Sequence, residues 1–189
     1  IASIKFPAHS TLIVSCVVPK ALKQLPHSCE ILRYRKDIRP FIKVSVRGAG
    51  DDRVAASSFA FRKFRASCIC VTAGTAITIN FIDRFGVLKG GVILPGIRLM
   101  ADSLGKFCAQ LPILRITQRH GMLGRDTRSA IEAGITNCAV AQIERIASAF
   151  HTHRIMLTGG DARLIAPNKA VIEEDAVLKG MMLDFFDSV

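Results

Sequence analysis

The residue types best suited to proton transfer and anion binding stand together at positions 50–53, Gly-Asp-Asp-Arg. A carboxylate such as Asp52 can accept a proton from a hydroxyl group, while the neighbouring Arg53 can bind an anion. Gly50 makes the loop flexible, and Asp51 or Asp52 can cap the helix that follows. The simpler interpretation of these residues is a capped helix that carries a surface ion pair.

Three further loops carry features suited to phosphate binding. The tight turn at Gly74 and Thr75 joins two apolar strands, so that backbone N–H groups and a hydroxyl face one concavity. Thr127 stands at the start of the longest helical pattern, where free N–H groups favour anions. Gly159 and Gly160 follow a buried strand and could lie against a flat ring or a ribose. The ordinary interpretations are a hairpin, a helix cap and a plain turn, but four such loops point to nucleotide-dependent phosphoryl transfer.

The composition favours anionic partners but not a dedicated nucleic-acid binder. The 189 residues include 26 Lys and Arg against 15 Asp and Glu, a formal net charge of +11, which attracts nucleotides and phosphorylated metabolites. The basic residues are scattered, and one Tyr with no Trp supplies few rings on which bases could stack. No apolar run approaches the roughly 20 residues that span a bilayer. We therefore expect no membrane partner and no specific nucleic acid.

Six cysteines, mostly inside apolar runs, are typical of small core residues in a reduced, cytoplasmic protein. The alternative is a metal site built from Cys68, Cys70, His151 and His153. The C-x-C spacing is not the usual zinc pattern, so the prediction is buried thiols and solvated histidines.

Strand and helix patterns alternate along the chain, with a three-stranded meander between positions 67 and 98. β-branched and aromatic residues favour the strands, whereas apolar residues at steps of three and four favour the helices. The expected strands are 11–18, 31–32, 41–46, 155–158 and 169–172, and the expected helices are 20–25, 51 onward, 97–108, 126–150 and 175–186. This alternation predicts an α/β protein.

The order of several motifs resembles that of type III pantothenate kinases. The matching segments are I-V-S-C-V-V-P from 13, G-D-D-R from 50, A-G-T-A-I-T-I from 73, L-K-G-G-V-I-L-P-G-I-R-L-M from 88, A-Q-L-P from 109, G-R-D-T-R-S-A-I-E-A-G from 124, L-T-G-G-D-A from 157 and D-A-V-L-K-G-M from 175. The resemblance implies the ribonuclease H-like fold of actin, sugar kinases and heat-shock ATPases, with two related lobes and a nucleotide cleft between them. It also implies a homodimeric transferase that uses ATP to phosphorylate the primary hydroxyl of pantothenate, the first step of coenzyme A biosynthesis.

By position, the resemblance assigns roles to the four loops. Asp52 falls on the proton acceptor of the family, and Arg53 would steady the charge that shifts during the transfer. The implied pantothenate contacts are Gly50, Asp51, Asp52, Arg53 and Thr127, and the implied ATP contacts are Gly74, Thr75, Gly159 and Gly160.

Two departures from the family pattern bear on catalysis. The opening D-x-G-N-T turn, which binds phosphate and places the Mg²⁺ carboxylate, does not occur in this sequence, so we expect residues 1–66 to form an incomplete first lobe and 67–189 the second. The resemblance places a monovalent cation, K⁺ or NH₄⁺, beside an Asp where this chain has Thr72, and a later Asp where it has Asn80. A hydroxyl is a poorer ligand for a hard cation than a carboxylate. The alternative function is therefore a non-catalytic relative that keeps the fold, the dimer face and pantothenate binding.

Two spatial hypotheses follow. The first is that Asp52 lies across a shared cleft from the turn at Gly74 and Thr75. The second is that the helix at 126–150 forms part of the dimer contact, with Ile135 and Ala139 in it.

Overall fold

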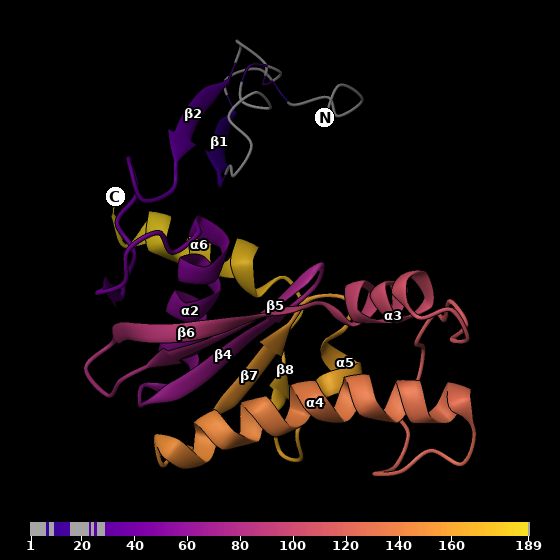
Figure 1. Cartoon of the computed structure of the whole chain (residues 1–189). Helices are drawn as coiled ribbons and strands as arrows, with labels where there is room; N and C mark the ends of the chain where they lie inside the picture. The colour runs from indigo at the N-terminus through magenta and orange to yellow at the C-terminus, as the bar shows by residue number, and fades with distance from the viewer. Residues whose placement is uncertain (1–6, 8–9, 16–22, 24, 26–28, 189) are drawn as a thin grey trace.

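The protein consists of a central sheet with helices on both faces, shown in Figure 1 from a computed structural model that describes residues 7, 10–15, 23, 25 and 29–188. The strands are β1 (Thr11–Val14), β2 (Glu30–Arg33), β3 (Lys43–Val44), β4 (Cys68–Ala73), β5 (Ala76–Ile82), β6 (Val87–Pro95), β7 (Ile155–Thr158) and β8 (Val171–Ile172). The helices are α2 (Asp51–Phe64), α3 (Ile97–Phe107), α4 (Thr127–Ala149), α5 (Ala162–Ile165) and α6 (Ala176–Phe186). The α/β class is confirmed.

The main sheet has the strand order β3-β6-β5-β4-β7-β8, and β1 and β2 form a separate parallel pair. β4, β5 and β6 form the predicted antiparallel meander. β7 runs parallel to β4, with Thr72 opposite Thr158. Because parallel neighbours end at the same edge of a sheet, the loops after β4 and β7 come together there.

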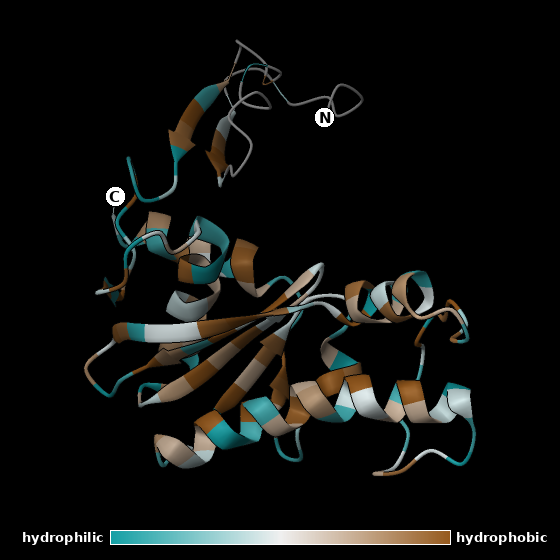
Figure 2. Cartoon of the chain, viewed as in Figure 1, coloured by the Kyte–Doolittle hydropathy of each residue, from teal (hydrophilic) through white to brown (hydrophobic). Residues whose placement is uncertain are grey.

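Strands β4, β5 and β7 are buried on both faces, so alternate side chains enter two separate cores. From β4, Cys68 and Cys70 enter a core with α2 and α6, whereas Ile69 and Val71 enter a core with α3, α4 and α5. Figure 2 shows the continuous apolar content of these strands. The sheet therefore separates the environment of α2 from that of α4.

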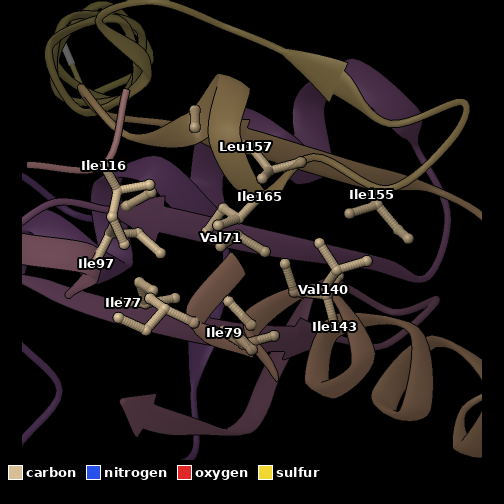
Figure 3. Packing of buried hydrophobic residues seen from close by; sticks show 14 of the residues in the cluster. Val71, Ile77, Ile79, Ile97, Ile116, Val140, Ile143, Ile155, Leu157 and Ile165 are labelled. Atoms are coloured by element: carbon tan, nitrogen blue, oxygen red, sulfur yellow. The ribbon is translucent and has the colours of Figure 1, made fainter. Parts of the chain in front are cut away.

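Helix α4 packs its apolar face on its own sheet. Figure 3 shows Val140 and Ile143 beside Ile79 of β5, with Val71 and Leu157 further into the same core. Ile135 and Ala139 belong to this core and are 6% and 0% exposed. Both residues are thus largely covered within one chain, although Ile135 also lines a groove between α3 and α4, and a dimer contact of α4 remains a prediction.

Most predicted elements are confirmed to within one or two residues. The strand expected at 41–46 shortens to β3, and the strand expected at 169–172 shortens to β8. Helix α5 was not predicted, since four residues are too few to show a period. The expected helix at 20–25 and the end of the strand at 11–18 lie mostly outside the described residues.

The two lobes expected at 1–66 and 67–189 remain a prediction. Across that boundary, β3 pairs with β6, and α2 packs on the main sheet. In the described part of the chain, no helix is long and apolar enough to cross a membrane.

Of the cysteines in the described residues, two are buried, two are exposed, and Cys29 is half-buried. Cys68 and Cys70 are buried as predicted, and burial raises the pKa of the Cys68 thiol to about 12. Cys108 and Cys138 are exposed, so the prediction of a core position is wrong for them. Among the described residues, no group of three His, Cys, Asp or Glu side chains could hold a metal ion.

A buried carboxylate, Asp184, ties α6 to α2 and to the chain before it. Asp184 is 0% exposed. It accepts hydrogen bonds from the Tyr34 hydroxyl at 2.5 Å, the Ser58 hydroxyl at 2.7 Å and the Arg62 guanidinium at 2.7 Å. Arg62 also pairs with the exposed Asp187 at 2.7 Å. The same guanidinium therefore pairs with one buried and one exposed acid.

These two acids give a matched test of burial. We expect Asp184→Asn to lower the free energy of unfolding by about 3–5 kcal/mol, because it removes the charge that compensates Arg62 inside the protein. We expect Asp187→Asn to lower it by about 0–1 kcal/mol, because water screens that pair. Urea unfolding measures both, and equal losses would contradict the role given to burial.

Candidate active site

Helix α2 begins at the Gly-Asp-Asp-Arg loop, as predicted. Gly50 is its N-cap, and Asp51 and Asp52 occupy its first turn, where the positive end of the helix dipole stabilises carboxylates. Asp51 pairs with Arg35, whose Nη1 lies 3.3 Å from Asp51 Oδ1. Asp52 is exposed. Of the two acids, Asp52 is thus the one open to solvent at the start of the helix.

The side chain of Arg53 leaves α2 and reaches the middle of β5. Its Nε and one Nη donate to the Asn80 side-chain oxygen at 3.0 and 2.6 Å. Asn80 is 0% exposed. The contact joins residues far apart in sequence and fixes the guanidinium against the sheet.

From Asn80 the hydrogen bonds continue toward the end of β4. The Asn80 amide donates to the Thr78 hydroxyl at 3.2 Å, and the Thr78 and Thr72 hydroxyls lie 2.7 Å apart. We call Arg53, Asn80, Thr78 and Thr72 the polar ladder. By strand alternation, its three strand residues lie on the face that carries Cys70, which is the α2 face. The ladder therefore connects the start of α2 with the strands that lead to the turn at Gly74 and Thr75.

The turn itself meets two other loops at the edge of the sheet. The Gly96 N–H, at the start of α3, donates to the Thr75 carbonyl at 2.9 Å. Gly159 has φ +100°, and a Cβ there would lie 2.3 Å from the Ala73 carbonyl oxygen. The Asp161 N–H donates to the same carbonyl at 3.2 Å. The loops expected to contact ATP thus lie side by side, and both are exposed.

Thr127 lies elsewhere, on a groove between α3 and α4. The groove has a volume of about 640 Å³ and is lined by Met100, Ser103, Leu104, Leu111, Thr127, Ala130, Ile131, Gly134, Ile135 and Cys138. The residue before Thr127, Asp126, caps α4 by accepting from the Ser129 N–H at 2.9 Å, and this hydrogen bond lowers the pKa of Asp126. Since α4 and α2 cover opposite faces of the sheet (Figure 1), the chain does not bring Thr127 to the polar ladder.

The residues at the expected monovalent-cation site do not fit such an ion. Thr72 offers one hydroxyl, which is shared with Thr78, and the Asn80 oxygen is already taken by a guanidinium. A hard cation prefers carboxylates and several free oxygens, and the positive charge of Arg53 opposes a second cation.

Asn80 and its neighbour Gly91 are the functional-site residues whose contacts sequence reasoning missed. Asn80 was noted only as a departure from the family pattern. A Cβ at Gly91 would lie 2.8 Å from the Asn80 oxygen and 3.1 Å from Arg53 Nη2. A buried amide inside an apolar strand, opposite a Gly pair, was the signal that could have found this contact.

The Gly159-Gly160 loop provides a matched stability test. We expect Gly159→Ala to cost about 1–3 kcal/mol, because a side chain is strained at that φ and meets the Ala73 carbonyl. We expect Gly160→Ala to change stability by less than about 0.5 kcal/mol, since its added Cβ meets no atom within 4 Å. Thermal and urea unfolding compare the two variants, and a larger loss for Gly160→Ala would refute the close packing.

Known proteins match this chain over most of its length. A family model described as type III pantothenate kinase matches residues 2–149. A type III pantothenate kinase of Chlorobaculum tepidum is 37% identical over 145 residues, which cover 69% of this chain and 54% of that protein. One from Agathobacter rectalis is 30% identical over 196 residues, covering 93% and 74%. With the first of these relatives, the chain thus spans about half of the relative's length.

A solved structure supports the fold alone. The crystal structure of a Baf family protein from Campylobacter jejuni has a TM-score of 0.65 at 17% identity, covering 96% of this chain and 98% of that one. The family model and the sequence relatives show the family as well as the fold. By these matches, the chain belongs to the type III pantothenate kinase family.

Proposed function

We propose that this protein, with ATP as the phosphoryl donor, phosphorylates the primary hydroxyl of pantothenate. The observation that carries the proposal is the polar ladder, because it joins the Gly-Asp-Asp-Arg helix start to the strands of the phosphate turn on one face of the sheet. A kinase needs an acceptor hydroxyl and a phosphate tail held close together, and phosphoryl transfer depends mainly on such positioning. Membership of the family supports the same reaction.

In this proposal the start of α2 receives the acceptor. The exposed carboxylate of Asp52 accepts the hydroxyl proton as the new bond to phosphorus forms. Because the transition state is loose, the proton leaves late, and an ordinary carboxylate is basic enough. Arg53 offers its remaining N–H groups to the anionic substrate or to the shifting phosphoryl charge. Gly50 and Asp51 complete the pantothenate contacts.

The nucleotide would lie at the edge of the sheet after β4 and β7. There the exposed turn at Gly74 and Thr75 offers the Thr75 hydroxyl to the phosphates, while the Gly74 N–H donates to the Ala76 carbonyl at 3.1 Å within the hairpin. The adjacent Gly159-Gly160 backbone could face the adenosine. The ribonuclease H-like two-lobed fold, a Mg²⁺ ion that accompanies ATP and a cytoplasmic location belong to the same proposal.

The alternative is a relative that binds pantothenate without turning it over. The observation that favours it is the donor set at Thr72 and Asn80, which does not suit the monovalent cation expected beside the phosphate turn. This alternative predicts pantothenate binding without ADP release.

Thr127 enters the proposal only through a second chain. Within one chain Thr127 faces the groove between α3 and α4. A pantothenate molecule held by Asp52 of one chain could therefore contact only the Thr127 of a second chain. We infer a homodimer in which the second copy covers this groove. Exposed apolar side chains beside the groove support it: Phe107, Ile113, Met122 and Leu123. Asn137 of α4 donates to the Gly121 carbonyl at 3.1 Å, which holds the turn that carries two of them against the helix.

Replacing the proton acceptor tests the reaction. We expect Asp52→Asn to lower the rate of pantothenate phosphorylation by about 10²–10⁴-fold, because the amide cannot take the hydroxyl proton. Coupled detection of ADP measures the rate, with unchanged urea unfolding as evidence of an intact fold. Asp102→Asn, on the exposed face of α3, is the control and keeps the rate. Equal rates for Asp52→Asn and the unmodified protein would rule out the assigned role.

A charge placed beside the groove tests the dimer. Leu123 is 86% exposed in one chain, so Leu123→Glu should leave the monomer folded. We expect it to shift elution on a sizing column from dimer to monomer, because a buried unpaired charge is costly at an interface. Leu178→Glu, at a 63% exposed position on α6, should elute as a dimer. A dimer for both variants would place the contact elsewhere.

A further inference from the structure

The hydrogen bonds of Asn80 are fully used and leave one possible orientation. A guanidinium can only donate, so the atom that it contacts must be the amide oxygen. The amide nitrogen then donates to the Thr78 hydroxyl at 3.2 Å and lies 3.5 Å from the Cys70 carbonyl oxygen. A buried polar network in which every group has a partner is rigid. Asn80 is therefore well suited to hold Arg53 in one position.

The opposite strand leaves room for this pair. Asn80 faces Gly91 across the β5–β6 ladder, and any larger residue there would press on both the amide and the guanidinium. The neighbouring Gly90 has open space where its Cβ would be. A Cβ at Gly91 would also meet the backbone carbonyl oxygen of Ile79, so glycine there leaves room both for the neighbouring strand and for the Arg53–Asn80 contact.

Asn80 holds the guanidinium without cancelling its charge. The polar ladder contains one guanidinium, one amide and two hydroxyls, so Arg53 carries its only formal charge. Of the two acids that precede Arg53 in α2, Asp51 pairs with Arg35 and Asp52 is exposed to solvent. An aspartate at position 80 would accept the same hydrogen bonds but would neutralise Arg53. The amide therefore holds the guanidinium in position and leaves its charge in place, whereas a carboxylate would hold it and neutralise it.

We propose that Asn80 is a positioning residue for Arg53, and that the guanidinium it holds replaces a monovalent cation as the fixed positive charge that binds a phosphate-bearing anion on the α2 face of the sheet. The inference rests on the proposed kinase function for its role in turnover. Its physical content, an anion bound by a rigid arginine without help from K⁺, does not require turnover.

The first measurement follows the Arg53 Nε–H proton by NMR, assigned through its loss in Arg53→Lys. The probe is inorganic triphosphate, titrated in KCl and in choline chloride at equal ionic strength. We expect a slowly exchanging Nε–H signal that shifts as triphosphate binds, with affinities in the two salts that agree within about twofold. An affinity at least about tenfold tighter in KCl would overturn the replacement of the cation, since that factor corresponds to about 1.4 kcal/mol.

Two substitutions at position 80 separate positioning from charge. Asn80→Ala should lose the slow Nε–H exchange and weaken triphosphate binding about tenfold, because the guanidinium loses the hydrogen bonds that hold it in place. Asn80→Asp should keep the slow exchange but also weaken binding, because the carboxylate neutralises the guanidinium. Asn137→Ala, which removes another hydrogen-bonded amide, should change neither signal. Unchanged exchange and affinity in Asn80→Ala would overturn the proposal, and Asn80→Asp provides the test if Asn80→Ala does not fold.

Pantothenate phosphorylation, measured separately, distinguishes this inference from the function on which it rests. Triphosphate binding at Arg53 without turnover would retain the inference and reject the kinase function. Turnover that needs K⁺, with an Arg53 signal that triphosphate does not move, would retain the kinase function and reject the inference. Absence of both triphosphate binding at Arg53 and pantothenate phosphorylation would reject both the inference and the kinase function.

Discussion

The contact between Arg53 and Asn80 is the interaction on which the arrangement of the site depends. It joins the first turn of α2 to the middle of β5, across the interface between a helix and the sheet. A guanidinium at such an interface is stable only when its donors have partners, because an unpaired buried charge is costly. The Asn80 oxygen accepts from the Nε and from one Nη of Arg53, and the Thr78 hydroxyl in turn fixes the amide. As a result, the helix start that carries Asp52 has a defined position relative to the β4–β5 hairpin.

The sheet imposes the second constraint, because its strands β4, β5 and β7 are buried on both faces. Side chains of one strand therefore alternate between two cores, and the sheet separates these cores from each other. The polar ladder is on the α2 face, whereas the capped start of α4 and the groove beside it are on the other. Within one chain, Asp52 and Thr127 therefore lie on opposite sides of the sheet. The family resemblance assigns both residues to pantothenate, but one chain does not bring them into one site.

Backbone contact, rather than side chains, brings the loops at the sheet edge together. The carbonyl oxygen of Ala73 accepts from the Asp161 N–H and leaves no room for a side chain at Gly159. The Gly96 N–H meets the Thr75 carbonyl. These contacts require glycine at the close approach, and they leave the turn exposed at the end of the buried strands. Because glycine has no side chain, a ligand can approach the backbone of this edge at Gly74 and Gly160 with little steric hindrance.

Apolar patterns and motif order in the sequence were enough to locate most elements and to identify the family. Short apolar runs rich in β-branched residues located the meander and β7, and apolar residues at steps of three and four located α4, because such patterns reflect burial of a local structure. Motif order identified the type III pantothenate kinases, and the Gly-Asp-Asp-Arg loop was correctly placed at a helix start. Which face each element covers became clear only from the fold: Ile135 and Ala139 pack on their own sheet, Cys108 and Cys138 remain exposed, and Arg53 contacts Asn80. The physical reason is that an apolar stripe reports that a residue is buried but not what buries it, and a hydrogen bond between strand and helix leaves no periodic trace in the chain.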